Sequence, residues 1–371
     1  MDGGKLVATG SSSCIFNPNF PCRKNGVIDK DRISKIIYSP GAKKESQHEK
    51  KMNEKIKKIK GSQEWSLIFD QYCKPFSKDK LITYDRKGIR DCFKSEYDKE
   101  YIENFDANSY MMNGEYGGIT FEEYFEITFR GKGTDKKFLN LMEKMEPLFL
   151  GLKEMSKNNI IHNDIKYNNI VVHEGVLKFI DFGLSNSLSM KNHFKERSLD
   201  EYKSGRIYIH YPLEYILYYA PKEKLNLELE SLDHEEVRRV NFPLLQSVNL
   251  LFSMDIHDIY HGTVYAIKRG MINQTEMIKG IDIYSLGIQV PLLFLTKYPN
   301  SNIFKKPSQL LMDFYGLFGK MTTPLSKDRI NASECYGQFK TLLDKYRDKK
   351  VVSSKKSKKQ KKQKKQKKRK K

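Results

Sequence analysis

The sequence predicts an α+β fold with short strands early in the chain and a long helix further on. Residues 33–37 read I-S-K-I-I and alternate apolar and polar side chains in the manner of a strand. Between residues 138 and 155, apolar side chains recur at helical spacing, which predicts a buried helix. Residues 170–172 and 176–180 are apolar runs on either side of a polar turn, and they predict a β-hairpin. A length of 371 residues is enough for one large or two modest domains.

The loops on either side of this hairpin carry the side chains that a divalent ion and a phosphate group would need. Asp164 and Asn169 precede the first strand, and Asp181 follows the second. Because Mg²⁺ is held by few protein oxygens together with substrate phosphates, carboxylates and an amide near a nucleotide suffice. Lys166 adds a positive charge two residues after the first carboxylate. These residues predict a site for magnesium and phosphate, although Asp and Asn are also common in plain solvated loops.

The order and spacing of these residues resemble two motifs of eukaryotic-type protein kinases. Residues 162–169 read H-N-D-I-K-Y-N-N and are similar to the catalytic loop H-R-D-L-x-x-x-N, and residues 181–183 read D-F-G, the metal-binding motif. Kinases usually have an Arg directly before the catalytic Asp, and this Arg binds a phosphate on the activation loop. This chain has Asn163 at that position. We therefore expect activity without phosphorylation of the activation loop.

The resemblance implies a role for each polar residue. Asp164 would accept the proton of the substrate hydroxyl, and Asn169 and Asp181 would hold the metal ions that bridge the phosphates. Lys166 would neutralise charge on the transferred phosphoryl group, and its presence suggests Ser or Thr as the acceptor.

Near the N-terminus, residues 6–16 fall where a kinase has its glycine-rich loop. Aligned on G-x-G-x-x-G-x-V, the chain keeps only the middle glycine, and the four positions are occupied by Ala8, Gly10, Ser13 and Ile15. Small side chains still let backbone N–H groups approach the nucleotide phosphates. The alternative for a Ser-rich stretch is an ordinary turn.

The strand at residues 33–37 carries Lys35, which the resemblance assigns to the α- and β-phosphates. Residues 44–60 predict a helix, since apolar side chains recur at helical spacing at Met52, Ile56 and Ile59. Glu49 lies in register with this apolar face, so we expect it to form the ion pair with Lys35 that kinases need. Glu54 is the alternative partner.

Residues 67–72 and 110–112 are apolar enough for further strands, and residues 113–118 read N-G-E-Y-G-G. This last segment resembles the hinge between kinase lobes, where backbone groups near Glu115 and Tyr116 would hydrogen-bond adenine. The same letters also fit an ordinary turn. Asn113 or Gly114 would occupy the gatekeeper position, which would leave an open back pocket.

Further motifs of the C-terminal half extend the resemblance. The polar segment after Gly183 ends in Y-P-L-E at Glu214 and resembles an activation segment closed by a variant of A-P-E. Residues 282–287 read D-I-Y-S-L-G, similar to the start of the helix beneath the active site, where Asp282 would support the catalytic-loop backbone. Arg329 is expected to form a buried ion pair with Glu214.

The net charge of +21 is concentrated at the C-terminus. Lys355–Lys371 contains twelve Lys and one Arg without an acidic residue, which predicts a disordered tail. Such a block can contact polyanions or nucleic acid, but it has no aromatic side chains to stack on bases. Over the whole chain, a composition of 39% hydrophobic and 12% aromatic residues indicates a folded protein.

The cysteines and the apolar runs give expectations about location. The five cysteines are scattered, with no C-x-x-C pair, which favours unpaired thiols in a reducing compartment. The longest apolar run, residues 290–295, is far short of the roughly 20 residues that a membrane-spanning helix needs. We therefore expect a soluble, intracellular protein with no transmembrane segment.

By the resemblance, the chain divides into a small β-rich kinase N-lobe at residues 1–116, a larger helical C-lobe at 117–348 and a disordered Lys-rich tail at 349–371. An insert of unknown role occupies about 215–280 of the C-lobe. The short N-lobe, this insert and a composition rich in Lys, Asn, Ile and Tyr are similar to the serine/threonine kinases of large nucleocytoplasmic DNA viruses. That narrower resemblance implies the host cytoplasm, nucleus or virion.

The expected function is transfer of the γ-phosphate of ATP to Ser or Thr of protein substrates, with Mg²⁺ as the cofactor and Mn²⁺ as a substitute. One alternative is a pseudokinase scaffold tethered by the basic tail, since the glycine-rich loop is degenerate. Another is a small-molecule kinase of the aminoglycoside type, which shares the Asp-to-Asn loop, although Lys166 and the intact D-F-G favour a protein kinase.

Overall fold

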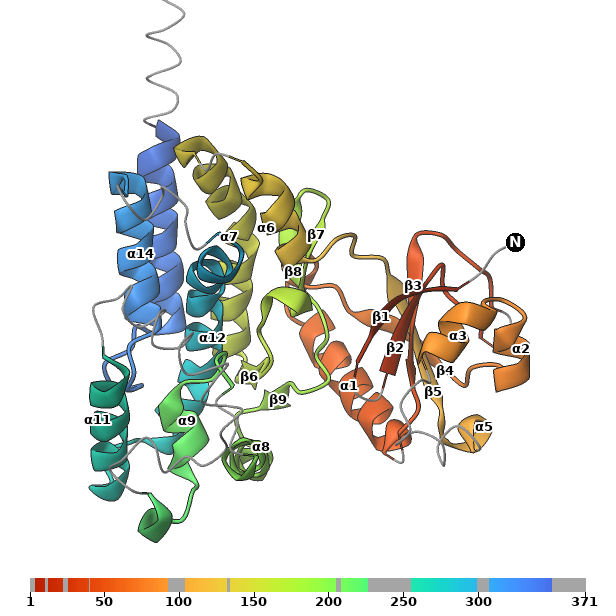
Figure 1. Ribbon diagram of the computed structural model, residues 1–371, viewed down its shortest axis with the longest axis horizontal. Coiled ribbons are helices and arrows are strands. Elements are labelled where there is room, and N and C mark those ends of the chain that lie inside the picture. The colour runs from red at the N-terminus through yellow and green to blue at the C-terminus, as the bar shows by residue number, and fades with distance from the viewer. Residues whose placement is uncertain are drawn as a thin grey trace, which may run out of the picture.

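A computed structural model shows two parts, a sheet-rich N-terminal lobe and a helical C-terminal lobe, joined near residue 116 (Figure 1). The α+β prediction is confirmed. The structure describes residues 4–10, 13–22, 26–39, 41–92, 104–131, 134–204, 208–225, 255–298 and 307–348. The basic tail at 349–371 and residues 226–254 of the predicted insert lie outside these ranges.

The N-terminal lobe is built on an antiparallel sheet of five strands in the order β1-β2-β3-β5-β4. The strands are β1 (Lys5–Thr9), β2 (Ser13–Asn17), β3 (Arg32–Ile37), β4 (Phe69–Cys73) and β5 (Tyr110–Glu115). The strands expected at residues 33–37, 67–72 and 110–112 are therefore confirmed as β3, β4 and β5, with shifted ends.

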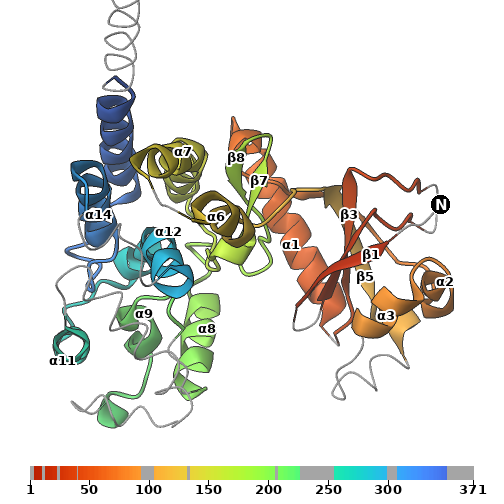
Figure 2. The same ribbon diagram turned by 45° about the horizontal axis from the view of Figure 1, so that its top comes forward.

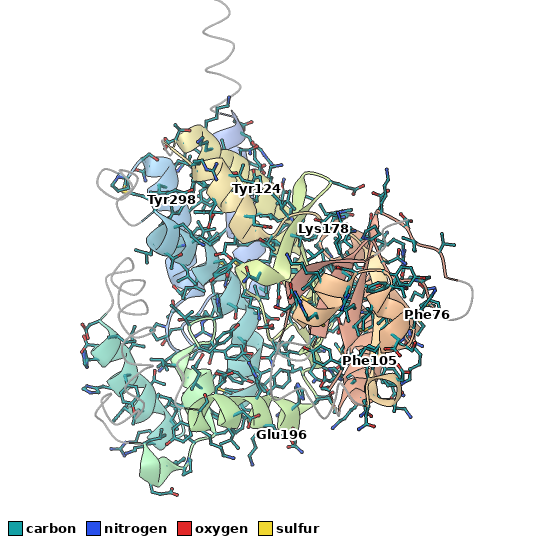
Figure 3. The ribbon with its side chains drawn as sticks, turned by 45° about the vertical axis from the view of Figure 1, so that its right-hand side comes forward. Phe76, Phe105, Tyr124, Lys178, Glu196 and Tyr298 are labelled. Atoms are coloured by element: carbon teal, nitrogen blue, oxygen red, sulfur yellow. A yellow bond between two sulfur atoms is a disulfide. The ribbon has the colours of Figure 1, made fainter. Side chains whose placement is uncertain are left out.

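Helices cover both sides of this sheet. Helix α1 (Ala42–Lys57) confirms the helix expected at 44–60, and it buries Met52 and Ile56. It lies on the side of the sheet that faces the C-terminal lobe, as Figures 1 and 2 both show. The segment between β4 and β5 contains the short helices α2 (Lys78–Ile82), α3 (Arg86–Cys92) and α5 (Phe105–Asn108). Figure 3 shows Phe76 and Phe105 of this segment on the outer side of the lobe, where Phe105 is buried.

Two disulfides link the N-terminal lobe, so the expectation of unpaired thiols was wrong. Cys14 pairs with Cys92 and Cys22 pairs with Cys73, each with a Cα–Cα distance of 5.9 Å. Cys335 is free and buried. The paired residues are 78 and 51 positions apart in the sequence, so only the folded sheet brings them together. The inference of a reducing compartment therefore loses its basis.

The C-terminal lobe packs its helices around α12 (Gln274–Lys297), in which every residue from 280 to 294 is buried. The helix expected at 138–155 is confirmed as α7 (Asp135–Lys157), which begins where the Thr134 hydroxyl accepts a hydrogen bond from the Lys137 N–H. The other helices are α6 (Phe121–Phe129), α8 (Lys191–Lys203), α9 (Leu213–Tyr218), α11 (Ile256–Lys268), α14 (Gln309–Met321) and a helix over residues 332–348. Single 3-10 turns lie at η1 (Ser62–Glu64), η3 (Tyr167–Asn169) and η4 (Lys222–Lys224).

Helix α12 is long and apolar enough to cross a membrane by length and composition alone. However, 89% of its most apolar 18-residue window is buried inside the protein, as is usual for the central helix of a folded domain. It is the one helix of this kind in the part of the chain that the structure describes.

The predicted hairpin is confirmed as β7 (Ile170–His173) and β8 (Val176–Phe179). Its turn residues Glu174 and Gly175 have φ angles of 50° and 82°, the left-handed backbone that two-residue hairpin turns require. The Phe179 N–H donates to the Trp65 carbonyl at 2.8 Å, which ties the hairpin to the chain leading into β4. A second small pair, β6 (Ile160–Ile161) with β9 (Asn186–Ser187), closes the loops around the hairpin.

Candidate active site

A cleft of about 440 Å³ lies between the two lobes. The N-terminal lobe contributes the predicted residues Ala8, Gly10, Ser13, Ile15 and Lys35 to its lining. The linker contributes residues 114–118, and the C-terminal lobe contributes Lys166, Asn169, Val171 and Asp181. The backbone N–H of Gly10 donates to the Ser13 carbonyl at 2.7 Å, which holds the end of β1 close to the start of β2 at the cleft.

Lys35 lies at the inner end of the cleft between two carboxylates. Its Nζ is 3.0 Å from Glu49 Oε2 and 2.8 Å from Asp181 Oδ1. The ion pair with Glu49 is confirmed, whereas the alternative partner, Glu54, is an exposed residue of the same helix. Because Lys35 reaches from β3 to α1 and to the D-F-G segment at once, it fixes the relative position of three elements.

The charges of this group depend on one another. Burial would lower the pKa of Lys35, but the carboxylates of Asp181 and Glu49 outweigh it, and the net effect is a raised pKa. Burial would raise the pKa of Asp181, but Lys35 outweighs it, and the net effect is a lowered pKa. Burial raises the pKa of Glu49 to about 7, against the opposing effect of Lys35. Lys35 therefore stays an ammonium and Asp181 a carboxylate at neutral pH.

Helix α1 is also tied to the segment that follows D-F-G. His48 Nε2 lies 2.8 Å from the Ser185 carbonyl, and Lys55 Nζ donates to Ser187 Oγ at 2.6 Å. The His48 ring stacks on His193 of α8, with ring centroids 5.8 Å apart. These contacts hold α1 in the position that brings Glu49 to Lys35.

The loop before the hairpin gathers polar groups around Asp164. Its Oδ2 accepts hydrogen bonds from Lys166 Nζ at 3.0 Å and from Asn169 Nδ2 at 2.7 Å. Its Oδ1 accepts one from the Tyr208 hydroxyl at 3.1 Å. Lys166 and Asn169 line the cleft, so the carboxylate of Asp164 stands at its edge. No sequence pattern pointed to Tyr208, because it belongs to no recognisable motif.

Asp282 supports this loop from beneath, as the sequence predicts. Its Oδ2 accepts a hydrogen bond from the His162 N–H at 2.6 Å, and its Oδ1 accepts one from the Asn163 N–H at 2.9 Å. Asn163 has a φ angle of 61°, a left-handed backbone that few side chains other than Asn adopt readily. Asp282 thus holds a strained loop in the shape that presents Asp164.

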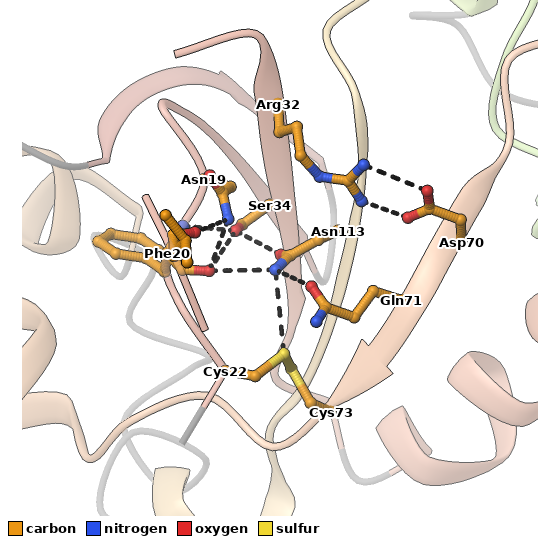
Figure 4. The surroundings of a disulfide bond; sticks show 10 residues. Asn19, Phe20, Cys22, Arg32, Ser34, Asp70, Gln71, Cys73 and Asn113 are labelled. Carbon is orange, nitrogen blue, oxygen red and sulfur yellow. Dashed lines mark hydrogen bonds and ion pairs between the residues drawn. A yellow bond between two sulfur atoms is a disulfide. The ribbon is translucent and has the colours of Figure 1, made fainter. Parts of the chain in front are cut away.

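Of the two gatekeeper candidates on β5, only Gly114 lines the cleft. Asn113 faces away from the cleft, where its side chain bonds to Ser34, to the Phe20 carbonyl and to Gln71, as Figure 4 shows. Gly114 lines the cleft instead. A Cβ atom there would lie 3.0 Å from Phe69 Cδ1, so the ring of Phe69 occupies the space behind the glycine. The open back pocket stays a prediction.

Residues 115–118 line the cleft as expected for an adenine-binding linker. The Tyr116 N–H is engaged, since it donates to the Asp31 carbonyl at 2.9 Å. At Gly117, a Cβ atom would lie 2.6 Å from Val171 Cγ2, so the linker approaches the hairpin more closely than other residues would allow. Hydrogen bonding of adenine by backbone groups near Glu115 and Tyr116 stays a prediction.

The predicted pair beyond the cleft is also confirmed. Arg329 Nη2 lies 2.9 Å from Glu214 Oε1, and both side chains are almost completely buried. The Ser326 N–H donates to the other carboxylate oxygen at 2.8 Å. This ion pair fixes the start of α9 to the loop after α14.

Comparison with known proteins gives an independent indication. Residues 101–209 match the family model described as the protein kinase domain. The chain is 26% identical over 136 residues to the tyrosine-protein kinase receptor torso of Bombyx mori, an alignment that covers 35% of this chain and 16% of the relative.

Two further relatives are kinases of other organisms. A probable cell division protein kinase of Encephalitozoon cuniculi is 39% identical over 72 residues, or 19% of this chain and 26% of the relative. The serine/threonine-protein kinase PrkC of Bacillus subtilis is 38% identical over 73 residues, or 19% of this chain and 10% of the relative. The chain thus aligns with only about a quarter or less of each relative's length. Over the matched segments, the chain is thus similar to protein kinases.

Proposed function

We propose that this chain is an ATP- and Mg²⁺-dependent protein kinase that phosphorylates Ser or Thr side chains of proteins. The proposal rests on two clusters of charged side chains at one cleft. In the first, Lys35 lies between two carboxylates, and in the second, Asp164 lies beside Lys166. Phosphoryl transfer requires positioning and charge stabilisation more than covalent chemistry from the protein, and these side chains are suited to both.

Each group has one task in the proposed reaction. Asp164 takes the proton of the acceptor hydroxyl as its oxygen attacks the γ-phosphorus. Lys166 lies 3.0 Å from that carboxylate and lines the cleft, so its ammonium can stabilise charge on the transferred phosphoryl group. Lys35, held by Glu49, binds the α- and β-phosphates in the cleft that Gly10 and Ser13 also line.

Asn169 and Asp181 are the proposed metal ligands. Within the described ranges, no group of three or more His, Cys, Asp or Glu side chains could form a metal site made of protein ligands alone. The pair fits Mg²⁺, which takes one or two protein oxygens and completes its shell with phosphates and water. Bound Mg²⁺ supplies neutralisation of the phosphate charge.

The preference for Ser or Thr is the finer part of the proposal. It is supported by Lys166 and by the PrkC relative, which is named a serine/threonine kinase. The torso relative is named a tyrosine kinase, so the acceptor class has to be measured.

An assay with γ-labelled ATP tests the proposed function. The full chain is incubated with Mg²⁺ and a panel of acceptors that includes mixed proteins, Ser, Thr and Tyr peptides and an aminoglycoside. We expect label on Ser or Thr of proteins, and we expect EDTA to abolish it. Label on the aminoglycoside alone would favour a small-molecule kinase. Nucleotide binding without transfer to any acceptor would favour a pseudokinase.

Independence from activation-loop phosphorylation is a second expectation. The contacts of His48 with Ser185 and of Lys55 with Ser187 hold α1 in place with unmodified serines. At the position before Asp164, where an Arg would bind a phosphate of the activation loop, the chain has Asn163. We expect that treatment with a phosphatase that acts on Ser, Thr and Tyr changes the initial rate of transfer to a protein substrate by no more than about twofold relative to untreated protein. The rate is measured after the phosphatase has been inhibited, and loss of activity would refute the expectation.

A further inference from the structure

A short segment of the N-terminal lobe crosses the sheet on the face that points away from the cleft. It consists of residues 18–22, which follow β2, and we call it the strap. The Phe20 N–H donates to Ser34 Oγ of β3 at 2.7 Å, and the Phe20 carbonyl accepts from Asn113 Nδ2 of β5 at 3.1 Å. Ser34 lies next to Lys35, and because neighbouring side chains of a strand point to opposite faces, the strap lies on the face opposite the ammonium. The strap therefore contacts the two strands that follow β2 in the sheet.

A disulfide ties the end of the strap to β4, the strand at the edge of the sheet. Cys22 of the strap pairs with Cys73, the last residue of β4. The Asn113 amide lies beside this bond, as Figure 4 shows, with its Nδ2 4.0 Å from Cys22 Sγ and 3.0 Å from Gln71 Oε1 of β4. Because β4 has a neighbouring strand on one side only, and its pairing with β5 is irregular between Phe69 and Gln71, these contacts stabilise its position.

The position of β4 matters for the cleft. Phe69 of β4 lines the cleft, and its ring lies next to Gly114 and 5.9 Å from Lys35 Nζ. Leu67 and Ile68, directly before β4, line the cleft as well. A displacement of β4 would therefore change both the wall of the cleft and the surroundings of the ammonium.

The two disulfides of the lobe differ in their access to a reductant. Cys14 is completely buried and Cys92 nearly so, whereas Cys73 is only partly buried. In thiol–disulfide exchange, the attacking thiolate must reach one of the two sulfur atoms, so Cys73 is the accessible target. Cys22 is then the sulfur that leaves, and the Asn113 amide beside it can donate to the thiolate more strongly than to a disulfide sulfur. Both features favour reduction of this disulfide before the buried one.

We propose that the Cys22–Cys73 disulfide is a redox switch for nucleotide binding; this rests on the proposed function, in which the cleft binds ATP. A thiolate of a dithiol reductant attacks Cys73 Sγ, and the bond to Cys22 breaks with its electron pair on Cys22 Sγ, which takes up a proton. The second thiol of the reductant then attacks its own first sulfur, and Cys73 leaves as a thiolate and is protonated. Two electrons and two protons pass to the protein, and the reductant becomes a disulfide. A disulfide oxidant reverses the reaction.

Reduction loosens β4 in two ways. The covalent bond between the strap and β4 is lost, and the Cys22 sulfur competes with Gln71 for the Asn113 amide. Only chains with β4 in place keep the wall at Phe69 and bind nucleotide with full affinity. If reduction lowers that fraction to about a tenth, the apparent Kd rises about tenfold.

Titration of the full chain with a fluorescent ATP analogue and Mg²⁺ tests the proposal. The chain is equilibrated in graded concentrations of dithiothreitol, and mass spectrometry after alkylation identifies the reduced cysteines. We expect the Cys22–Cys73 pair to be alkylated at lower concentrations than the other disulfide, and the Kd to rise about tenfold at that step. Oxidised glutathione should restore the disulfide and the affinity. An unchanged Kd after reduction of this pair, or earlier reduction of the buried disulfide, would overturn the inference.

Two variants separate this disulfide from the other thiols. Cys22→Ser combined with Cys73→Ser should bind the analogue about tenfold more weakly than the oxidised wild type and should not respond to mild reduction. Cys335→Ala is the matched control, because it removes the free thiol and leaves both disulfides, and it should respond like the wild type.

Circular dichroism of the wild type at each concentration of reductant shows whether the fold persists. We expect an unchanged spectrum at the step where the affinity falls. Unfolding of the chain at that step would show a structural cross-link and overturn the switch. Equal affinity in both redox states, together with transfer of label to proteins, would overturn the inference alone. An oxidised chain that binds no ATP analogue would overturn the proposed function and the inference with it.

Discussion

Replacing Asp164 with Asn is expected to lower phosphoryl transfer to protein substrates by roughly 10²- to 10⁴-fold, the usual contribution of a general base. The amide has nearly the shape of the carboxylate, so the neighbouring groups can keep their positions, but it cannot take a proton at neutral pH. Nucleotide affinity should change little, since Asp164 stands at the edge of the cleft and does not line it. Initial rates with labelled ATP and a separate nucleotide-binding titration measure the two effects.

The matched control for this variant is Asp79→Asn, on the exposed surface of α2 in the N-terminal lobe. It makes the same chemical change far from the cleft, and it should retain the wild-type rate. If the Asp164 variant kept wild-type turnover, Asp164 could not be the base. If it lost nucleotide binding as well as turnover, its effect would be structural.

Breaking the ion pair between Arg329 and Glu214 is expected to destabilise the fold by about 3–5 kcal/mol, because one charge is left buried without its partner. The side chains are 1% and 0% exposed, so water cannot replace the lost contact. Glu214→Gln leaves the guanidinium with three carbonyl acceptors, at Thr323, Gly280 and Pro324. Denaturant titration measures this loss of free energy of unfolding. We expect the midpoint of the transition to fall while the dependence of the free energy on denaturant concentration stays unchanged.

Arg347→Met is the control for burial. Arg347 lies 2.9 Å from Glu146, but its side chain is 33% exposed, and such a pair contributes only about 0–1 kcal/mol. For the buried pair, the double variant with Arg329→Met and Glu214→Gln should lose less free energy of unfolding than the two single variants lose together, because the two residues share one interaction. Additive losses would show that the two side chains act independently, against the assignment of a buried pair.

Residues whose partners lie in recognisable motifs could be predicted from the sequence. Lys35 and Glu49 were placed by strand alternation and by the helical register of α1, and the structure joins them at 3.0 Å. The supporting contact of Asp282 and the pair of Arg329 with Glu214 were implied by motif positions, and both are present. In each case, one short stretch of sequence carried enough pattern to place the side chain.

What could not be predicted depends on contacts across the sheet and between loops. The disulfides join cysteines that no local spacing connects, and Tyr208 meets Asp164, 44 positions earlier in the sequence, only in the folded chain. The predicted domain limits and the resemblance to viral kinases stay predictions, as does polyanion contact by Lys355–Lys371, which lies outside the described residues.

The ring of Phe69 behind Gly114 has a consequence for small molecules that would compete for this cleft. The aromatic ring comes from β4, and Lys35 Nζ lies 5.9 Å from its centroid, so it borders both the glycine and the ammonium. A compound designed to extend past a small residue on β5 would meet this ring and would have to displace it. Selectivity among inhibitors would then depend on the rotamer of a β4 side chain, and a Phe69→Ala protein would admit compounds that the natural protein excludes.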